Sequence, residues 1–203
     1  MSHSRIVLLL LAVVAMPADT LAQEPRGWFL RGQGGGAPAY NVATDTLQMH
    51  SGRAGAYIES STSQDDFGTL MQAFAPEQYR GRRVRLSAFL RTQDVTGAAG
   101  LWMRVEARGD ITLGFDNMME RPIRGTTDWS EHQVVLDIPA EAQTIAMGVL
   151  LVGNGRVWVD DFELMPVDPS TAATNLVQPG EPGSSGRPQS PLAAGPLNLD
   201  FEN

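Results

Sequence analysis

The chain has 203 residues, with 23 acidic against 15 basic side chains and a formal net charge of −8. Every basic side chain is an arginine, and the acidic balance argues against binding to nucleic-acid phosphates, which requires net positive charge. There is no cysteine, which excludes disulfides, lipid attachment through a cysteine and thiolate metal sites. A hydrophobic core therefore has to hold the fold.

Residues 1–22 are typical of a secretory signal peptide. Arg5 precedes an apolar run that Pro17 interrupts, and small residues lead up to Ala22. The run of about 11 residues is too short to cross ~30 Å of bilayer hydrocarbon as a helix. We expect cleavage after Ala22, export to the periplasm or the medium, and no membrane span in the mature chain.

The composition divides the rest of the chain at Asp168. Residues 23–168 keep a regular hydrophobic pattern and are long enough for one domain with its own core. Residues 169–197 are rich in Pro, Gly and Ser, and we expect a disordered linker there. In residues 198–203, Leu199 and Phe201 alternate with polar residues, which predicts a strand-like tail.

Inside the domain the hydrophobic period is two, which predicts strands with one core face and one outer face. Apolar residues alternate with polar ones around Leu86, Met103, Leu113 and Val159. Further strands are expected at residues 28–30, 54–60, 69–74, 132–138 and 144–152. Turn sequences separate these segments, among them Thr96-Gly97 and, most clearly, Gly153-Asn154-Gly155. The fold class is therefore all-β, an antiparallel two-sheet β-sandwich or jelly roll.

Several segments, in this order, resemble those of a known domain family: residues 67–72, 79–87, 100–105, 115–118, 121–123, 125–129 and 157–161. Together they resemble the carbohydrate-binding-module-like jelly rolls of the galactose-binding-like superfamily, in particular the accessory domain type found in exported bacterial hydrolases and peptidases. Such domains often begin with a strand of the type Asn-Leu-Asp-Phe-Glu ahead of Gly-Trp. Here that sequence stands at residues 198–202, so the tail is either a truncated second repeat or a first strand that returns beside Trp28.

A sugar site needs an aromatic platform with hydrogen-bonding groups around it. Trp102 and Arg104 share the strand face opposite the core residues, and Trp158 lies similarly on its own strand. The resemblance implies that Gln72, Arg91 and Asn117 join them. The alternative is that both tryptophans are packed under loops and that Arg104 is paired with an acid.

Asp160 and Asp161 stand at the end of the last strand, where domains of this type often hold a structural calcium. Calcium takes six to eight oxygen ligands, and adjacent strand residues point to opposite faces, so we expect at most one of the two to serve. The mature chain has only His50 and His132 and no thiol, which argues against a transition-metal site.

The sequence contains no recognisable catalytic constellation, since a nucleophile needs a base and an orienting group beside it. We therefore expect an exported, non-catalytic module that binds a carbohydrate or glycan through an aromatic-lined sheet face. One alternative is a module that docks an exported protein partner. The other is an accessory N-terminal fragment of a larger exported hydrolase or peptidase.

Overall fold

The computed structural model describes residues 24–32, 39–60, 66–109, 111–177, 181–182 and 191–203, so the predicted signal peptide lies outside it. Within these ranges the chain forms β-strands and no helix, and thus nothing helical that is long and apolar enough to cross a membrane. The predicted all-β sandwich is confirmed. The strands are β1 (Phe29–Gly32), β2 (Tyr40–Asp45), β3 (Gly55–Ser60), β4 (Phe67–Phe74), β5 (Arg82–Ala107), β6 (Ile111–Asp116), β7 (Ile123–Ile138), β8 (Thr144–Val152), β9 (Arg156–Val167) and β10 (Glu181–Pro182).

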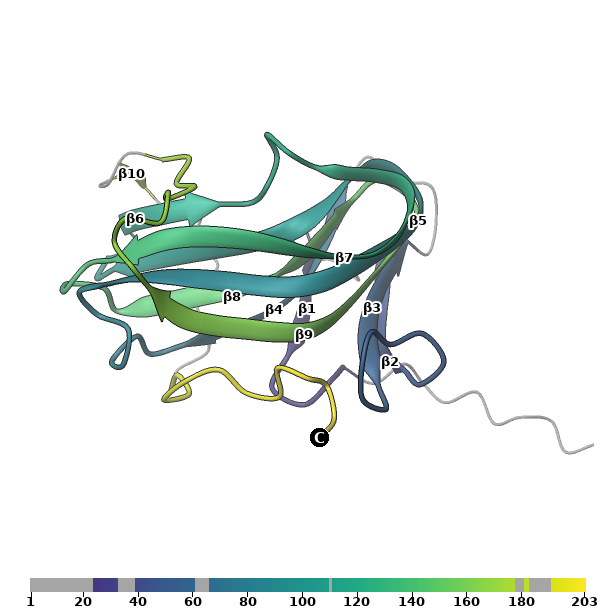
Figure 1. Cartoon of the computed structure of the whole chain (residues 1–203), viewed down its shortest axis with the longest axis horizontal. Helices are drawn as coiled ribbons and strands as arrows, with labels where there is room; N and C mark the ends of the chain where they lie inside the picture. The colour runs from purple at the N-terminus through teal and green to yellow at the C-terminus, as the bar shows by residue number, and fades with distance from the viewer. Residues whose placement is uncertain (1–23, 33–38, 61–65, 110, 178–180, 183–190) are drawn as a thin grey trace, which may run out of the picture.

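The long strand β5 belongs to both layers of the sandwich (Figure 1). Its residues 82–93 pair antiparallel with β7 and β9, and β9 continues to β3 and β2. Its residues 98–107 pair with β8, which continues to β4 and β1, and with β6, which carries β10. We call the first set the β7–β9 layer and the second the β4–β8 layer.

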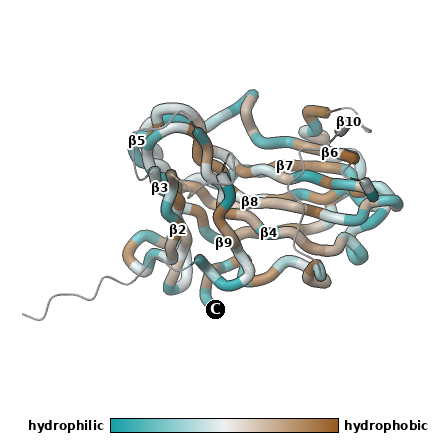
Figure 2. The backbone as a smooth tube through the Cα atoms, turned by 180° about the vertical axis from the view of Figure 1, so that it is seen from behind, coloured by the Kyte–Doolittle hydropathy of each residue, from teal (hydrophilic) through white to brown (hydrophobic). Residues whose placement is uncertain are grey.

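The hydrophobic core lies between these layers and follows the period-two pattern. Leu86 and Leu90 of the β7–β9 layer and Leu101 and Met103 of the β4–β8 layer are fully buried in one cluster. Figure 2, seen from behind, shows the largely hydrophobic course of β4 and β8. Alternate side chains of each strand point into the core, and the ones between them point to an outer face of the sandwich. A ligand can bind only to these outward-facing side chains.

Three features of the strands differ from the sequence prediction. Thr96-Gly97 was expected to be a turn, but the chain continues through it within β5, with register shifts and a positive φ of 53° at Asp94 that bend the strand between the layers. β7 begins at Ile123 rather than at residue 132, because its first half follows β5 round this bend. β2 was not predicted at all, since only Tyr40 and Val42 of its six residues are buried.

The prediction of a disordered linker over residues 169–197 is wrong for its described parts. The Thr174 N–H donates to the Val135 carbonyl (2.8 Å), and the Leu176 N–H donates to the Phe115 carbonyl (2.8 Å). Further along, the Ala75 N–H donates to the Ala193 carbonyl (2.8 Å). Polar composition did not prevent these segments from following the sandwich surface, since their backbone groups found partners on strand edges.

The tail is not a strand. Residues 198–203 form turns, with positive φ at Asn198 (48°) and Phe201 (55°), and they pair with no strand ladder. The segment nevertheless lies beside Trp28, whose indole Nε1 donates to the Asn198 carbonyl (3.0 Å). Alternation of Leu199 with its neighbours was therefore a poor guide to local conformation.

Candidate functional site

A groove of about 420 Å³ crosses the outer face of the β4–β8 layer. Outward-facing side chains of β1, β4, β5, β6 and β8 and of the turn after β6 form it, and most of them are apolar. Phe67 and Met119 are the exposed large side chains of its wall. The residues that line it are Phe29, Arg31, Gly32, Phe67, Thr69, Met71, Trp102, Arg104, Phe115, Asn117, Met119, Leu150 and Val152.

Trp102 is held rigidly in the floor of this groove. Its Nε1 donates to the Thr69 hydroxyl (2.7 Å), and that hydroxyl donates to the Val149 carbonyl (2.9 Å). The ring packs with Ala146 and Leu150 in a small hydrophobic cluster separate from the core, and the residue is 7% exposed. A locked ring with a satisfied N–H offers a ligand an apolar surface at little entropic cost.

Arg104 stands two residues further along β5, on the same face. Its Nε lies 2.9 Å from a carboxylate oxygen of Glu106, and both side chains are largely buried. Two charges that have been removed from water are tolerated only when they compensate each other. The pair therefore brings hydrogen-bonding groups to the groove wall without adding net charge.

The remaining polar groups lie near the groove's ends. Arg31 stacks its guanidinium over Phe29, 4.5 Å from the ring centroid, and is exposed. The side-chain oxygen of Asn117 accepts a hydrogen bond from the Met119 N–H (3.3 Å), which fixes the amide at the end of β6. The described lining residues include no aspartate, glutamate or histidine.

The six predicted ligand-binding residues are distributed over three places. Trp102, Arg104 and Asn117 meet in the groove. Sequence reasoning missed Phe115, Met71 and the other apolar lining residues. Alternation on β4 does place Met71 opposite Leu70 and Phe74, but on β6 it placed Phe115 on the same face as Leu113, a residue of the core cluster.

Gln72 is not in the groove, because on β4 it shares the inner face with Leu70 and Phe74. Its side chain is 3% exposed and bonds to the backbone of Leu197. The prediction grouped it with Trp102 only through the expected sheet order.

Trp158 and Arg91 are cross-strand neighbours in the other layer, where the first half of β5 pairs with β9. Trp158 is 4% exposed, its Nε1 donates to a carboxylate oxygen of Asp45 (2.9 Å), and the guanidinium of Arg156 lies 5.2 Å from its ring centroid. Burial alone would raise the pKa of Asp45, but the hydrogen bond from Trp158 and those from backbone N–H groups lower it overall. Trp158 is thus a packed and satisfied side chain rather than a platform.

Asp160 and Asp161 both face the turn before β3, contrary to the prediction that they point to opposite faces. A positive φ of 52° at Asp161 and a register shift against β5 produce a bulge that turns the second carboxylate. Asp160 accepts backbone N–H groups of His50 (2.8 Å) and Ser51 (3.1 Å), and Asp161 contacts the His50 Nδ1 (2.7 Å) and the Ser51 hydroxyl (2.9 Å).

These contacts explain the two aspartates without a cation. Burial raises the pKa of Asp160 above its ordinary value, and the three N–H groups that point at it oppose this shift only in part. Among the described residues, no group of three or more His, Asp or Glu side chains is arranged to hold a metal ion. The geometry is that of a carboxylate pair that fixes a turn, so the proposed calcium ligands already have protein donors.

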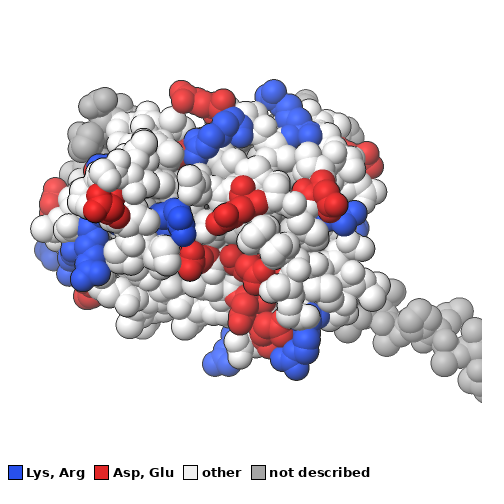
Figure 3. All heavy atoms as spheres, in the orientation of Figure 1, with Lys and Arg blue, Asp and Glu red and all other residues white. Residues whose placement is uncertain are grey.

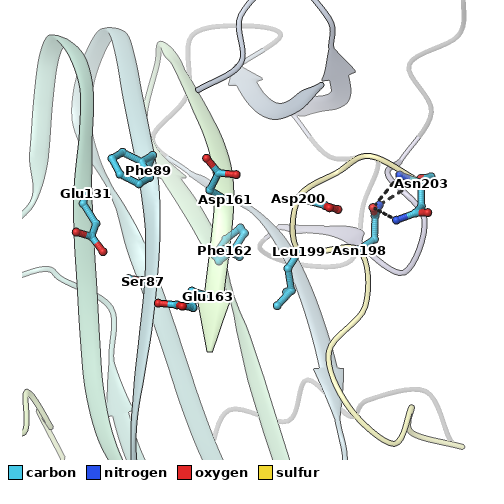
Figure 4. Close-up of a pocket in the computed structure, with 10 residues that line it drawn as sticks. All are labelled: Ser87, Phe89, Glu131, Asp161, Phe162, Glu163, Asn198, Leu199, Asp200 and Asn203. Carbon is cyan, nitrogen blue, oxygen red and sulfur yellow. Dashed lines mark hydrogen bonds between the residues drawn. The ribbon is translucent and has the colours of Figure 1, made fainter. Parts of the chain in front are cut away.

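A second cavity, of about 690 Å³, lies on the outer face of the β7–β9 layer and is closed on one side by the tail (Figure 4). Four carboxylates from β7, β9 and the tail border it: Glu131, Asp161, Glu163 and Asp200. Figure 3 shows acidic side chains gathered over β9 and the C-terminal segment. Glu163 pairs with the Arg85 guanidinium (3.2 Å), so part of this charge is compensated, and Asp161 contacts the His50 Nδ1 (2.7 Å).

Comparison with known proteins gives two kinds of similarity. No family model matches the chain. YbfP of Bacillus subtilis, named an uncharacterized HTH-type transcriptional regulator, is 40% identical over 185 residues, and these cover 90% of this chain and 58% of the regulator. The chain thus spans little more than half of that relative.

The solved structures share the fold at low sequence identity. The CBM22-1 xylan-binding domain of Paenibacillus barcinonensis Xyn10C is 16% identical, with a TM-score of 0.51 over 74% of this chain and 92% of that domain. The enzymatically active domain of bacteriophage CBA120 tailspike protein 4 is 9% identical, with a TM-score of 0.51 over 70% of this chain and 20% of that protein. The β-sandwich fold of carbohydrate-binding modules is therefore confirmed.

The predicted function, in contrast to the fold, is contradicted by these comparisons. An exported carbohydrate-binding module conflicts with 40% identity, over nearly the whole chain, to a protein named as a transcriptional regulator. That prediction was wrong because it took a ligand class from a fold, and folds of this kind carry many functions. Export itself stays a prediction, since it rests on residues 1–22.

Proposed function

We propose that this chain is a ligand-sensing module that binds a small, uncharged amphipathic molecule in the groove of the β4–β8 layer and serves a regulatory protein. The observation that carries the proposal is the groove itself. An apolar floor with a locked aromatic ring and a few fixed polar groups is the usual composition of a small-molecule site.

The regulatory role follows from the relative's name together with the architecture of this chain. A helix-turn-helix places a recognition helix in the major groove of DNA, and the described residues contain no helix. The net charge of −8 also opposes contact with phosphates. We therefore assign the similarity between the two chains to sensing, and DNA contact to the part of the regulator that this chain does not match.

The chemistry of the groove lining narrows the range of ligands that the groove can bind. Trp102, Phe115 and Met71 favour a flat or branched apolar body, and the Asn117 amide can orient a polar end. A cation finds no carboxylate among the described lining residues. An anion meets an Arg104 charge that Glu106 already neutralises, and the other lining arginine, Arg31, is exposed with its guanidinium stacked on Phe29. An uncharged molecule fits this balance best.

The groove supports binding rather than catalysis. Its described lining has no histidine, serine or carboxylate that would pair a nucleophile with a base. We accordingly propose no reaction for it.

The test is a thermal-shift screen of the full chain against a library of uncharged amphipathic metabolites, with calorimetry on each hit. Phe115→Ala should weaken a true groove ligand by about 1–2 kcal/mol, or roughly tenfold, because it removes apolar contact area. Trp129→Ala, on β7 of the opposite layer, is the matched control and should leave the affinity unchanged.

Two outcomes contradict the proposal. Hits that bind Phe115→Ala and the parent equally well would move the site elsewhere. Binding of oligosaccharides alone, with no uncharged amphipathic hit, would overturn the ligand class.

A further inference from the structure

The last residues of the chain occupy a well-defined seat at the edge of the sandwich. In Figure 1 the C-terminal segment runs along the side of β9, below the strand. From here on we count Leu197 with the tail, which then covers residues 197–203. We define the tail seat by six residues that lie against the tail: Trp28, Gly52, Arg53, Ala54, Gln72 and Phe162.

Gln72 shows that the seat is built for a peptide backbone. Its side-chain oxygen accepts the Leu197 N–H (2.8 Å), and its side-chain nitrogen donates to the Leu197 carbonyl (3.1 Å). Gln72 is 3% exposed, and the described residues give its amide no other hydrogen-bond partner. An unsatisfied buried amide is costly, and in the docked state the backbone groups of Leu197 satisfy this one.

Two further groups of the seat donate hydrogen bonds to the tail's main chain rather than to its side chains. The Trp28 indole donates to the Asn198 carbonyl (3.0 Å), and the Phe162 N–H donates to the Leu199 carbonyl (2.9 Å). Both donors come from elements distant in sequence, β9 and the segment before β1. The backbone path of the tail is thus fixed by the folded domain.

Two side chains supply sequence selectivity. Phe201 is 2% exposed, with its ring centroid 5.2 Å from that of Trp28. The Glu202 carboxylate accepts the N–H groups of Arg53 and Ala54 and pairs with the Arg53 guanidinium (2.9 Å). An aromatic residue followed by an acid is therefore what the seat selects.

We infer that the tail seat is a peptide-docking site that accepts the tail of a second copy of this chain. On the tail's side, all the contacts above are made by residues 197–203. The seat can therefore form the same contacts with this segment whether its own chain or a second copy provides it. Exchange of an identical element between copies costs little because native contacts are reproduced. The copy's own tail competes at a high effective concentration, so docking between copies needs a vacant seat and a free tail.

Two complementary variants of the full chain provide these two states. The tail variant, Phe201→Ala with Glu202→Ala, keeps an intact seat. The seat variant, Gly52→Asp with Gln72→Leu, keeps an intact tail. A Cβ at Gly52 would come within 2.2 Å of the Glu202 carboxylate, and an aspartate there also repels it. Gly81→Asp is the matched control, because Gly81 has a similar φ of +73° and nothing within 4 Å of the added Cβ.

Size-exclusion chromatography with light scattering measures the outcome, after circular dichroism has verified the fold and hydrogen exchange has verified release of the tail in each variant. We expect each variant alone to be monomeric and their mixture to form a 1:1 complex. Replacing the seat variant by the Gly81→Asp control should abolish the complex, since that copy's tail stays docked. A mixture that remains monomeric, although both tails are released, would overturn the inference.

A fluorescent peptide of residues 195–203 tests the seat without the second copy. It should bind the tail variant at least about tenfold more tightly than the parent, whose seat is filled. It should not bind a chain that carries all four substitutions. Equal binding to all three proteins, or to none, would contradict a docking site for this segment.

Discussion

Replacing Phe201 by alanine measures how much the tail stabilises the sandwich. The ring is almost fully buried and packs against Trp28 and Phe162, with centroids 5.2 and 6.1 Å away. Burial of a phenylalanine contributes about 1.5–3 kcal/mol, and an aromatic pair adds about 0.5–1.5 kcal/mol. These values set the upper range of the expected loss.

The loss of stability should be smaller than this upper range, because the tail can detach from the sandwich. A Phe→Ala change in a closed core costs about 3–5 kcal/mol, because a cavity remains. Here the tail can detach instead, so the loss cannot exceed the free energy of docking. We expect about 2 kcal/mol, which in a domain of this size lowers Tm by about 4–8 °C.

Calorimetry gives the Tm, and hydrogen exchange shows whether protection is lost over residues 197–203 and near Trp28. Leu47→Ala is the control, since Leu47 is 85% exposed and such changes stay within about 0.5 kcal/mol. An unchanged Tm would show that the tail contributes nothing to stability. A lowered Tm with full protection of residues 197–203 would refute the detachment argument.

Four further predictions follow from the contacts described above. The Arg53 N–H and guanidinium lower the pKa of Glu202, so its contribution to docking is present above the ordinary glutamate pKa and is lost as pH falls through the lowered one. Tail protection in hydrogen exchange should therefore fall as the solution is acidified below the ordinary glutamate pKa, and Glu202→Gln should remove this pH dependence. Trp158→Phe deletes the hydrogen bond to the Asp45 carboxylate and should cost about 1.5 kcal/mol in denaturant unfolding, with no change in ligand affinity of the groove. The chain should not change the fluorescence anisotropy of a labelled DNA duplex even at low salt, where its acidic charge and lack of a described helix predict no binding; saturable binding would refute this. The affinity for the groove ligand should change by less than about twofold between low and physiological salt.

Much of the fold was predictable because the core face of each strand is written in the sequence. In the stretches from Val84 to Leu90 and from Leu101 to Val105, every second residue is apolar, and the structure buries those residues between the layers: Val84, Leu86, Ala88, Leu90, Leu101, Met103 and Val105. The continuity of β5 was not predictable from the pattern. Thr96-Gly97 has the composition of a turn, and only the pairing of β5 with neighbours in both layers shows that the chain bends there without ending a strand.

The candidate site was predictable only within a strand. That Trp102 and Arg104 face away from the core follows from alternation, and the structure places both in the groove. Whether a residue of another strand joins them depends on which layer that strand enters. Trp158 is an outer residue as well, but of the opposite layer. Gln72 occupies an inner position because a polar residue there is satisfied by the tail's backbone, a partner 125 positions away that no local pattern reveals.

The bulge at Asp161 illustrates a second limit. A strict two-residue period assigns adjacent side chains to opposite faces, and a single positive φ cancels that assignment locally. Asn and Asp tolerate such a conformation better than most residues, so the Asp160-Asp161 pair was compatible with a bulge from the start. The bulge forms because of the His50-Ser51 turn, whose N–H and hydroxyl groups donate hydrogen bonds to both carboxylates when these face the turn.

The predicted salt insensitivity of ligand binding follows from how charge is divided between the two outer faces. Four acids border the cavity of the β7–β9 layer, whereas the described lining of the groove has none. Of the two arginines in that lining, Arg104 is compensated by Glu106, and Arg31 is exposed and stacks on Phe29. An anionic ligand would approach a chain of net charge −8, so added salt would screen the repulsion and raise its association rate. A cationic ligand would show the opposite trend. Stopped-flow or calorimetric titrations at several ionic strengths therefore report the ligand's charge directly: a strong dependence in either direction would refute an uncharged ligand while leaving the groove as its site, provided that Phe115→Ala still weakens binding.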